Sequence, residues 1–178
     1  MPSIAIFGIC VALSFIVWGT IAVQYLWPAL RTLPRRRALQ LLLLVHSFRF
    51  IGLAFVVPGV VSPNLPDEFA RPAAYGDLIA AVFALVALAG LSSKFGIGLV
   101  WAFNLWGVAD LLYAFYQGLI GVGIKPGQLG AAFFIPTVAV PLLFVTHILV
   151  FRLLMRGDGE AASQDPNSLA ENESPTKR

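Results

Sequence analysis

The sequence is poor in the residue types on which disulfide-bonded proteins and metalloenzymes depend. Among its 178 residues is a single cysteine, Cys10, which excludes an internal disulfide, a cysteine-held metal cluster and a CxxC redox pair. The two histidines lack the His and Glu spacing of a zinc enzyme, so no metal site is predicted. Charged residues make up only 12% of the chain, against about 25% in a soluble domain. This scarcity excludes an ordinary soluble domain, and no nucleic-acid partner is expected.

Apolar residues are abundant instead, at 58% of the chain. A chain of this size cannot bury so much apolar surface in one aqueous core, so the expected partner is the lipid bilayer. Five apolar runs reach the roughly 20 residues that a helix needs to cross ~30 Å of hydrocarbon. The sequence therefore predicts an all-α fold, in which residues 1–156 form one domain of five transmembrane helices. The expected spans are residues 4–30, 39–61, 72–91, 95–120 and 129–154.

The basic residues predict the orientation of these spans. With the N-terminus outside, seven Lys and Arg residues fall on the inner side and two on the outer side. Positive charge is retained on the cytoplasmic side, so we expect an N-out/C-in protein of a bacterial inner (plasma) membrane. Residues 157–178 are polar and acidic with almost no aliphatic side chains, which predicts a disordered cytoplasmic tail.

Two of the spans carry signals of packing or bending. Ala80, Ala84 and Ala87 follow a small-residue spacing that lets helix backbones approach closely, so the third span is expected to be a packing helix. The fifth span contains Pro136 and Pro141, each of which removes a backbone donor. We expect a kink there, which either serves packing or exposes a carbonyl to a ligand.

The sequence also places charge inside the membrane. Arg49 and Asp110 lie near the middle of the second and fourth spans, about 15 and 20 Å from their inner ends. A charge in hydrocarbon is costly, so such residues usually pair or line a functional cavity. A long arginine side chain can bridge the offset in depth. We therefore predict an ion pair between Arg49 and Asp110, whose disruption at Asp110 alone should cost more stability than neutralising both partners.

Three further polar residues lie at similar depths on three spans. His46 is one helical turn below Arg49, and Asn104 and His147 belong to the fourth and fifth spans. Together they are expected to form a polar layer on the inner side of the ion pair. Two imidazoles at similar depth on different helices are also candidate axial ligands of a haem.

The fourth span carries a row of aromatic and polar residues. Phe103, Trp106, Asp110, Tyr113 and Gln117 succeed one another at steps of three or four residues, the spacing of one helical face. This face predicts an aromatic-walled pocket with an acid at its floor. The candidate ligand-binding residues are Arg49, Asn104, Trp106, Asp110, Tyr113 and Gln117.

These features leave several functions open. We favour a non-enzymatic protein that binds or transports a small solute at the Arg49/Asp110 centre, as a homo-oligomer because five helices are few for a complete pathway. The alternatives are a redox protein with haem (or quinone) at His46 and His147, and a bundle whose charges only fix helix register. A lipid-handling enzyme using Asp110 or His46 as acid–base is disfavoured, because the sequence shows no nucleophile motif.

Two stretches carry a family resemblance. The run from His46 to Leu53 and the stretch from Trp101 to Gly118 resemble small multi-pass inner-membrane proteins of bacteria. The resemblance covers most of the chain before residue 157. It implies a helical membrane bundle and carries no activity with it.

The predicted orientation can be tested with a reporter. A reporter fused after Arg156 should show cytoplasmic activity, because seven basic residues share that side of the membrane with the fusion point. Alkaline phosphatase, active only in the periplasm, and green fluorescent protein, active only in the cytoplasm, give opposite readouts at this position. Phosphatase activity after Arg156 would contradict the orientation.

Overall fold

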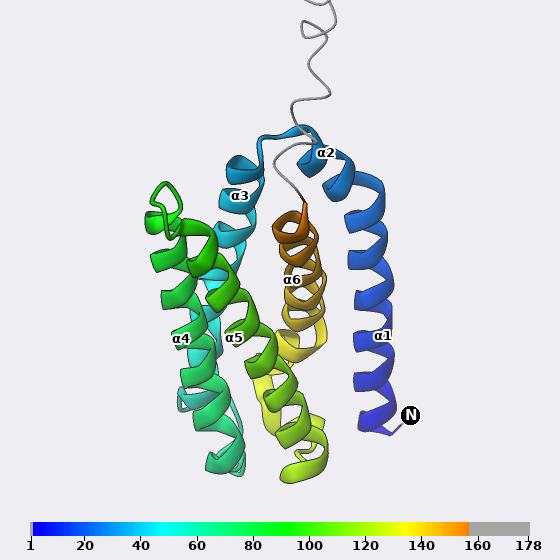
Figure 1. Ribbon diagram of the computed structural model, residues 1–178. Coiled ribbons are helices and arrows are strands. Elements are labelled where there is room, and N and C mark those ends of the chain that lie inside the picture. Colours follow the sequence, from blue (N-terminus) through cyan, green and yellow to red (C-terminus); the bar gives the residue numbers. More distant parts are fainter. Residues whose placement is uncertain (1, 157–178) are drawn as a thin grey trace, which may run out of the picture.

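The computed structural model describes residues 2–156 of the chain, and these residues are helical without a β-strand (Figure 1). Six α-helices alternate with 3-10 and π segments, which are labelled η. The elements are α1 (Ser3–Ile21), η1 (Ala22–Leu26), α2 (Trp27–Thr32), α3 (Arg35–Ser47), η2 (Phe48–Val56), α4 (Asp67–Gly90), α5 (Gly96–Tyr116), η3 (Gln117–Gly121), η4 (Pro126–Phe133), η5 (Ile135–Ala139) and α6 (Val140–Met155).

Among the described residues, five continuous helical stretches are long and apolar enough to cross a membrane, which confirms the predicted number. They are Ser3–Thr32, Arg35–Val56, Asp67–Gly90, Gly96–Gly121 and Ile135–Met155. Their bounds differ from the expected ones, most of all at Val56, Asp67 and Ile135, where residues 61, 72 and 129 were expected. The expected tail, residues 157–178, lies outside the described residues.

The helices form a bundle in which α4 and α6 each touch several neighbours (Figure 1). Helix α4 packs against α3, η2 and α5, whereas α6 packs against α5, α3 and α1. Helix α1 stands at the side of the bundle and has no buried residue of its own. Its exposed apolar side chains, such as Leu13, Ile16 and Val17, suit a lipid environment.

Small residues on α4 set how closely the helices pack. Ala80 and Ala84 are fully buried and Ala87 is 1% exposed, so the predicted packing role of this helix is confirmed. Helix α4 begins at Asp67, five residues before the expected Pro72. The acidic first turn, Asp67 and Glu68, favours a helix start because carboxylates interact well with the positive end of the helix dipole.

The second membrane-length helix changes its geometry halfway along. After Ser47 the α-helix tightens into the nine-residue 3-10 segment η2, which ends at Val56 rather than at the expected Val61. Three residues per turn place every third side chain on one face, and the buried residues of η2 are Arg49, Gly52 and Phe55. A 3-10 segment also rises about 2.0 Å per residue instead of 1.5 Å, which lengthens a short span.

The last membrane-length helix begins with an interruption. Gly130 has a positive φ of 52°, and the carbonyl oxygen of Val60 occupies the space that a side chain at Gly130 would need. The regular apolar helix therefore starts at Ile135 rather than at residue 129. Pro136 lies in the π segment η5 and Pro141 in the first turn of α6, so the predicted prolines do mark irregular backbone.

Arginines hold the helix ends together on the side where the α2–α3 loop and the end of α6 meet (Figure 1). Arg35 donates a hydrogen bond to the carbonyl oxygen of Leu154 at 2.5 Å, and Arg156 donates one to that of Arg31 at 2.8 Å. Arg152 lies over the ring of Trp27, with 4.3 Å between the guanidinium carbon and the ring centroid. Cations at helix C-termini satisfy otherwise orphaned carbonyls and complement the helix dipole.

The two larger apolar cores lie on either side of the middle of the bundle, and a small third cluster contains Leu111, Val140 and Leu143. One larger core includes Leu39, Leu43 and Leu153 near the arginine-rich end. The other includes Phe55, Phe69 and Leu129 near the opposite end. Between them lies a band of buried polar residues, which forms the candidate site.

Candidate functional site: a buried arginine between two carboxylates

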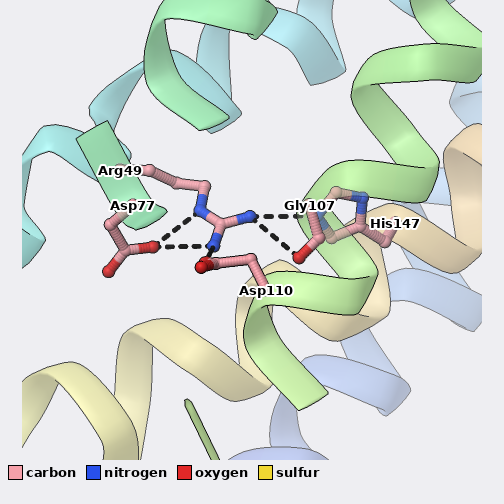
Figure 2. A network of polar contacts seen from close by, with 5 residues as sticks. All are labelled: Arg49, Asp77, Gly107, Asp110 and His147. Carbon is pink, nitrogen blue, oxygen red and sulfur yellow. Dashed lines mark hydrogen bonds and ion pairs between the residues drawn. The ribbon is translucent and has the colours of Figure 1, made fainter. Parts of the chain in front are cut away.

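Arg49 lies at the centre of the polar band, with its side chain fully buried (Figure 2). Its Nε donates to Asp77 Oδ1 at 2.8 Å, and its Nη2 lies 2.7 Å from the same oxygen and 2.6 Å from Asp110 Oδ2. Its Nη1 donates to the carbonyl oxygen of Gly107 at 3.1 Å and faces His147 Nε2 at 3.4 Å. A guanidinium has five N–H donors, and these five contacts use all of them.

Asp77 is the residue that the sequence reasoning missed. The predicted ion pair between Arg49 and Asp110 is present, but it is not the whole arrangement, because Asp77 of α4 pairs with the same arginine. The signal was available, since Asp77 lies inside the expected span 72–91. From its outer end, five residues at 1.5 Å place Asp77 about 7.5 Å deep, close to the level of Asp110 in a ~30 Å membrane.

Three glycines allow the charged groups to approach one another. A Cβ atom at Gly52 would overlap the carboxylate of Asp77, and one at Gly76 would overlap the carboxylate of Asp110. A Cβ atom at Gly107 would lie 2.5 Å from the imidazole of His147 and 2.9 Å from Arg49 Nη1. Each glycine therefore occupies a position where any side chain would displace a member of the network.

The three residues of the expected inner layer do lie together, and they join the arginine. His147 Nδ1 is 2.6 Å from Asn104 Oδ1, and Asn104 Nδ2 donates to the carbonyl oxygen of His147 at 3.4 Å. Because Arg49 can only donate, His147 Nε2 accepts, which places the imidazole proton on Nδ1 and directs it to Asn104. His46 stacks beside His147, and its Nε2 lies 3.1 Å from Thr146 Oγ1.

Of the predicted aromatic residues of α5, Phe103 reaches the polar band, where it packs against His46 and His147, whereas Trp106 and Tyr113 do not. Trp106 is 41% exposed and packs edge-on against Phe83, while Tyr113 is 49% exposed. Gln117 donates to the hydroxyl of Tyr113 at 3.0 Å on the exposed side of the helix. At the level of Arg49 the inward face of α5 presents Gly107, because the close approach of Arg49 and His147 leaves no space for a side chain there.

A cavity of about 60 Å³ begins at the two carboxylates and extends toward the end of the bundle opposite the arginine-rich loops. This is several times the ~10–15 Å³ that one water needs, and less than the ~150 Å³ cavity that holds a benzene molecule. Apolar side chains from α1, η2, α4, α5 and η5 line it, including Phe7, Phe55, Phe69 and Phe115. Asp77 and Asp110 are its charged lining residues among those described. The pocket thus has the predicted acid at its floor but is walled by phenylalanines.

The two histidines do not fit the expected pair of haem ligands. Their ring centroids are 4.1 Å apart, which is van der Waals contact. A haem ligated from both faces needs its macrocycle between the imidazoles, and rings in contact leave no space for it. Both rings also use a nitrogen for protein partners, Asn104 and Thr146. Within residues 2–156, no group of three His, Cys, Asp or Glu side chains is placed to hold a metal ion.

The fold and this network define an all-helical protein of the multi-pass membrane class, with a charged cluster inside the bundle. Residues 6–155 match the family described as a domain of unknown function, DUF8737, and the chain belongs to that family. No curated protein and no solved structure matches the chain.

The charge balance of the network predicts an order of stabilities that differs from that of a single ion pair. Arg49→Gln should lower the free energy of unfolding by about 3–5 kcal/mol, because it leaves two buried carboxylates unpaired. Asp110→Asn should cost much less, because it keeps the contact of Arg49 with Asp77. The triple variant R49Q/D77N/D110N should regain most of the loss, and R49Q/D110N should regain less, because it keeps Asp77 as an unpaired carboxylate. Reversible unfolding in mixed micelles measures all four. Equal losses for Arg49→Gln and Asp110→Asn would contradict the two-carboxylate arrangement.

The close approach at Gly107 gives a second prediction, with a control on the same helix. Gly107→Ala should destabilise the protein by about 1–3 kcal/mol, because the added methyl group meets His147 and Arg49. Gly98→Ala meets nothing within 4 Å and should be neutral or stabilising, because alanine favours the helix. Thermal unfolding of both variants in detergent compares them. A Gly107→Ala variant as stable as Gly98→Ala would show that the network is not packed so closely.

Proposed function

We propose that this protein binds a small solute inside the membrane, in the phenylalanine-lined cavity, with the polar end of the solute at Asp77 and Asp110. One observation carries the proposal: the carboxylates of a buried charged cluster line an apolar cavity within a bundle of membrane-length helices. Concave apolar sites with a few convergent polar groups are the usual form of a small-molecule site.

The hydrogen bonds of the carboxylates support a ligand role beyond a structural one. Each side chain is about nine-tenths buried, yet each has one oxygen, Asp77 Oδ2 and Asp110 Oδ1, without a hydrogen-bond partner among the described residues. Neither oxygen is fully enclosed by protein, and Asp77 Oδ2 lies beside Gly52 while Asp110 Oδ1 lies beside Gly76. A pair that only fixed helix register would gain from protein donors at these two oxygens. Both residues line the cavity, where a bound solute can contact them.

The distribution of charge supports the proposed orientation. The α2–α3 loop, the α4–α5 loop and the end of α6 share one end of the bundle (Figure 1), and they carry Arg31, Arg35, Arg36, Arg37, Lys94, Arg152 and Arg156. With that end in the cytoplasm of a bacterium, the N-terminus and the cavity lie in the outer half of the inner membrane. The site would then be loaded from the outer leaflet or the external side.

The backbone around the cavity supports movement of the solute as well as binding. The 3-10 segment η2 and the π segments η3 and η5 each contribute residues to the cavity wall. Such segments inside helices often mark hinges or functional sites. Five helices are few for a complete transport pathway, so we propose that transport at this site involves a homo-oligomer.

The proposal can be tested by filling the cavity. Ala114 of α5 lines it, whereas Ala102 is exposed on the same helix. Three probes with the same short tail, butylamine, 1-butanol and butyrate, are titrated into protein in lipid nanodiscs, and binding is followed by ligand-observed NMR after subtraction of empty nanodiscs. At least one probe should bind. Its affinity should fall about tenfold or more in Ala114→Phe and persist in Ala102→Phe, because only the first ring occupies the cavity.

Two outcomes would contradict the proposed function. Failure of all three probes to bind the native protein would favour a purely structural network. Binding that survives Ala114→Phe unchanged would place the site elsewhere.

A further inference from the structure

We propose that the solute is an organic cation, a small protonated amine with an apolar tail, and that a proton competes with it for the same carboxylates. The inference rests on the proposed function and names its ligand class. It follows from the charge of the cluster, the hydrogen bonds that the cluster leaves open and the residues of the cavity wall.

The cluster carries one negative charge in excess. Arg49 pairs with two carboxylates, Asp77 and Asp110, so with all three ionised one carboxylate charge lacks a counter-charge. The histidine beside it, His147, accepts from Arg49 through Nε2 and is therefore neutral in this arrangement. An uncompensated charge inside a membrane bundle is costly, so the site gains most from a cation or a proton.

The hydrogen bonds of the cluster also favour a positively charged ligand. All five N–H donors of Arg49 point to protein acceptors, and its side chain is fully buried. The polar groups that line the cavity are acceptors, namely the carboxylates of Asp77 and Asp110. A carboxylate or phosphate ligand would meet negative charge without a free donor, whereas an ammonium group brings three donors to unpartnered acceptors.

The cavity wall suits the apolar remainder of such a ligand. The wall includes Phe7, Phe55, Phe69 and Phe115, and Phe55 and Phe69 pack edge to face at 5.5 Å between ring centroids. Aromatic faces also attract cations, which adds to the preference for an ammonium group over a neutral one. The volume of about 60 Å³ favours a short or narrow tail over a ring.

Protonation of this site should lower its affinity for the amine. The charged and titratable groups that face the carboxylates are Arg49 from η2 and His147 from α6, with His46 of α3 behind His147. Protonation of either carboxylate removes the excess negative charge, and protonation of His147 adds a positive one. Both changes lower the affinity for a cation, so binding should weaken as the pH falls. The amine itself stays protonated, because alkylamines such as the lysine side chain titrate near pH ~10.4.

The experiment compares head groups on an identical tail. Butylammonium should bind the native protein in nanodiscs about tenfold or more tightly than 1-butanol, and butyrate should bind more weakly still. Asp110→Asn should weaken butylammonium binding about tenfold or more while the protein stays folded, because Arg49 keeps Asp77 as its partner. Asp67→Asn removes the same charge from an exposed pair with Arg71 outside the cavity, and it should leave binding unchanged. From pH 8 to pH 5 the affinity for butylammonium should fall, and less so in Asp110→Asn.

The results separate this inference from the proposed function. If 1-butanol or butyrate binds as tightly as butylammonium, and Ala114→Phe abolishes that binding, the cavity is a solute site but the ligand is not a cation. If butylammonium binds equally well to the native protein and to Asp110→Asn, or equally at pH 5 and pH 8, the carboxylates do not recognise it. If none of the probes binds, both the inference and the proposed function fail.

Discussion

The guanidinium of Arg49 is the constraint on which the centre of this protein depends. A cation in the middle of a membrane bundle is tolerated only when its charge and all of its donors are satisfied. Here three elements supply the partners: Asp77 from α4, Gly107 and Asp110 from α5, and His147 from α6, all reached from η2. The 3-10 geometry of η2 aims Arg49 at them, and glycines keep the distances short.

Different atoms of this network serve two roles, holding the helices together and contacting a ligand. The arginine side chain and the carboxylate oxygens that face it, Asp77 Oδ1 and Asp110 Oδ2, hold the helices together. The remaining carboxylate oxygens belong to side chains that line the cavity and keep their capacity for a ligand. An excess of acid over base at this depth is destabilising for an empty bundle, and it is the feature that gives the cavity a preference in charge.

Regular and irregular backbone are divided between the two ends of the bundle. The core that includes Leu39, Leu43 and Leu153 is built mainly from α-helices, with the short π segment η1 beside them, and arginine contacts join the helix ends. The cavity end is surrounded by η2, η3, η4 and η5, where the intrahelical hydrogen bonds deviate from the α pattern. Such a division places the more deformable backbone beside the candidate site and the more rigid packing away from it.

Composition and hydrophobic run length determined the helical class and the five membrane-length helices, because a chain in lipid must satisfy its backbone within each helix. The similar depths of Arg49 and Asp110 in their spans predicted their ion pair, and the alanine spacing predicted the packing face of α4. Face assignment failed for Trp106 and Tyr113, because an aromatic residue on an apolar helix can face lipid as well as protein. Only the tertiary structure decided that Asp77 shares Arg49, since side-chain direction depends on a 3-10 turn and three close glycine contacts that lie far apart in sequence.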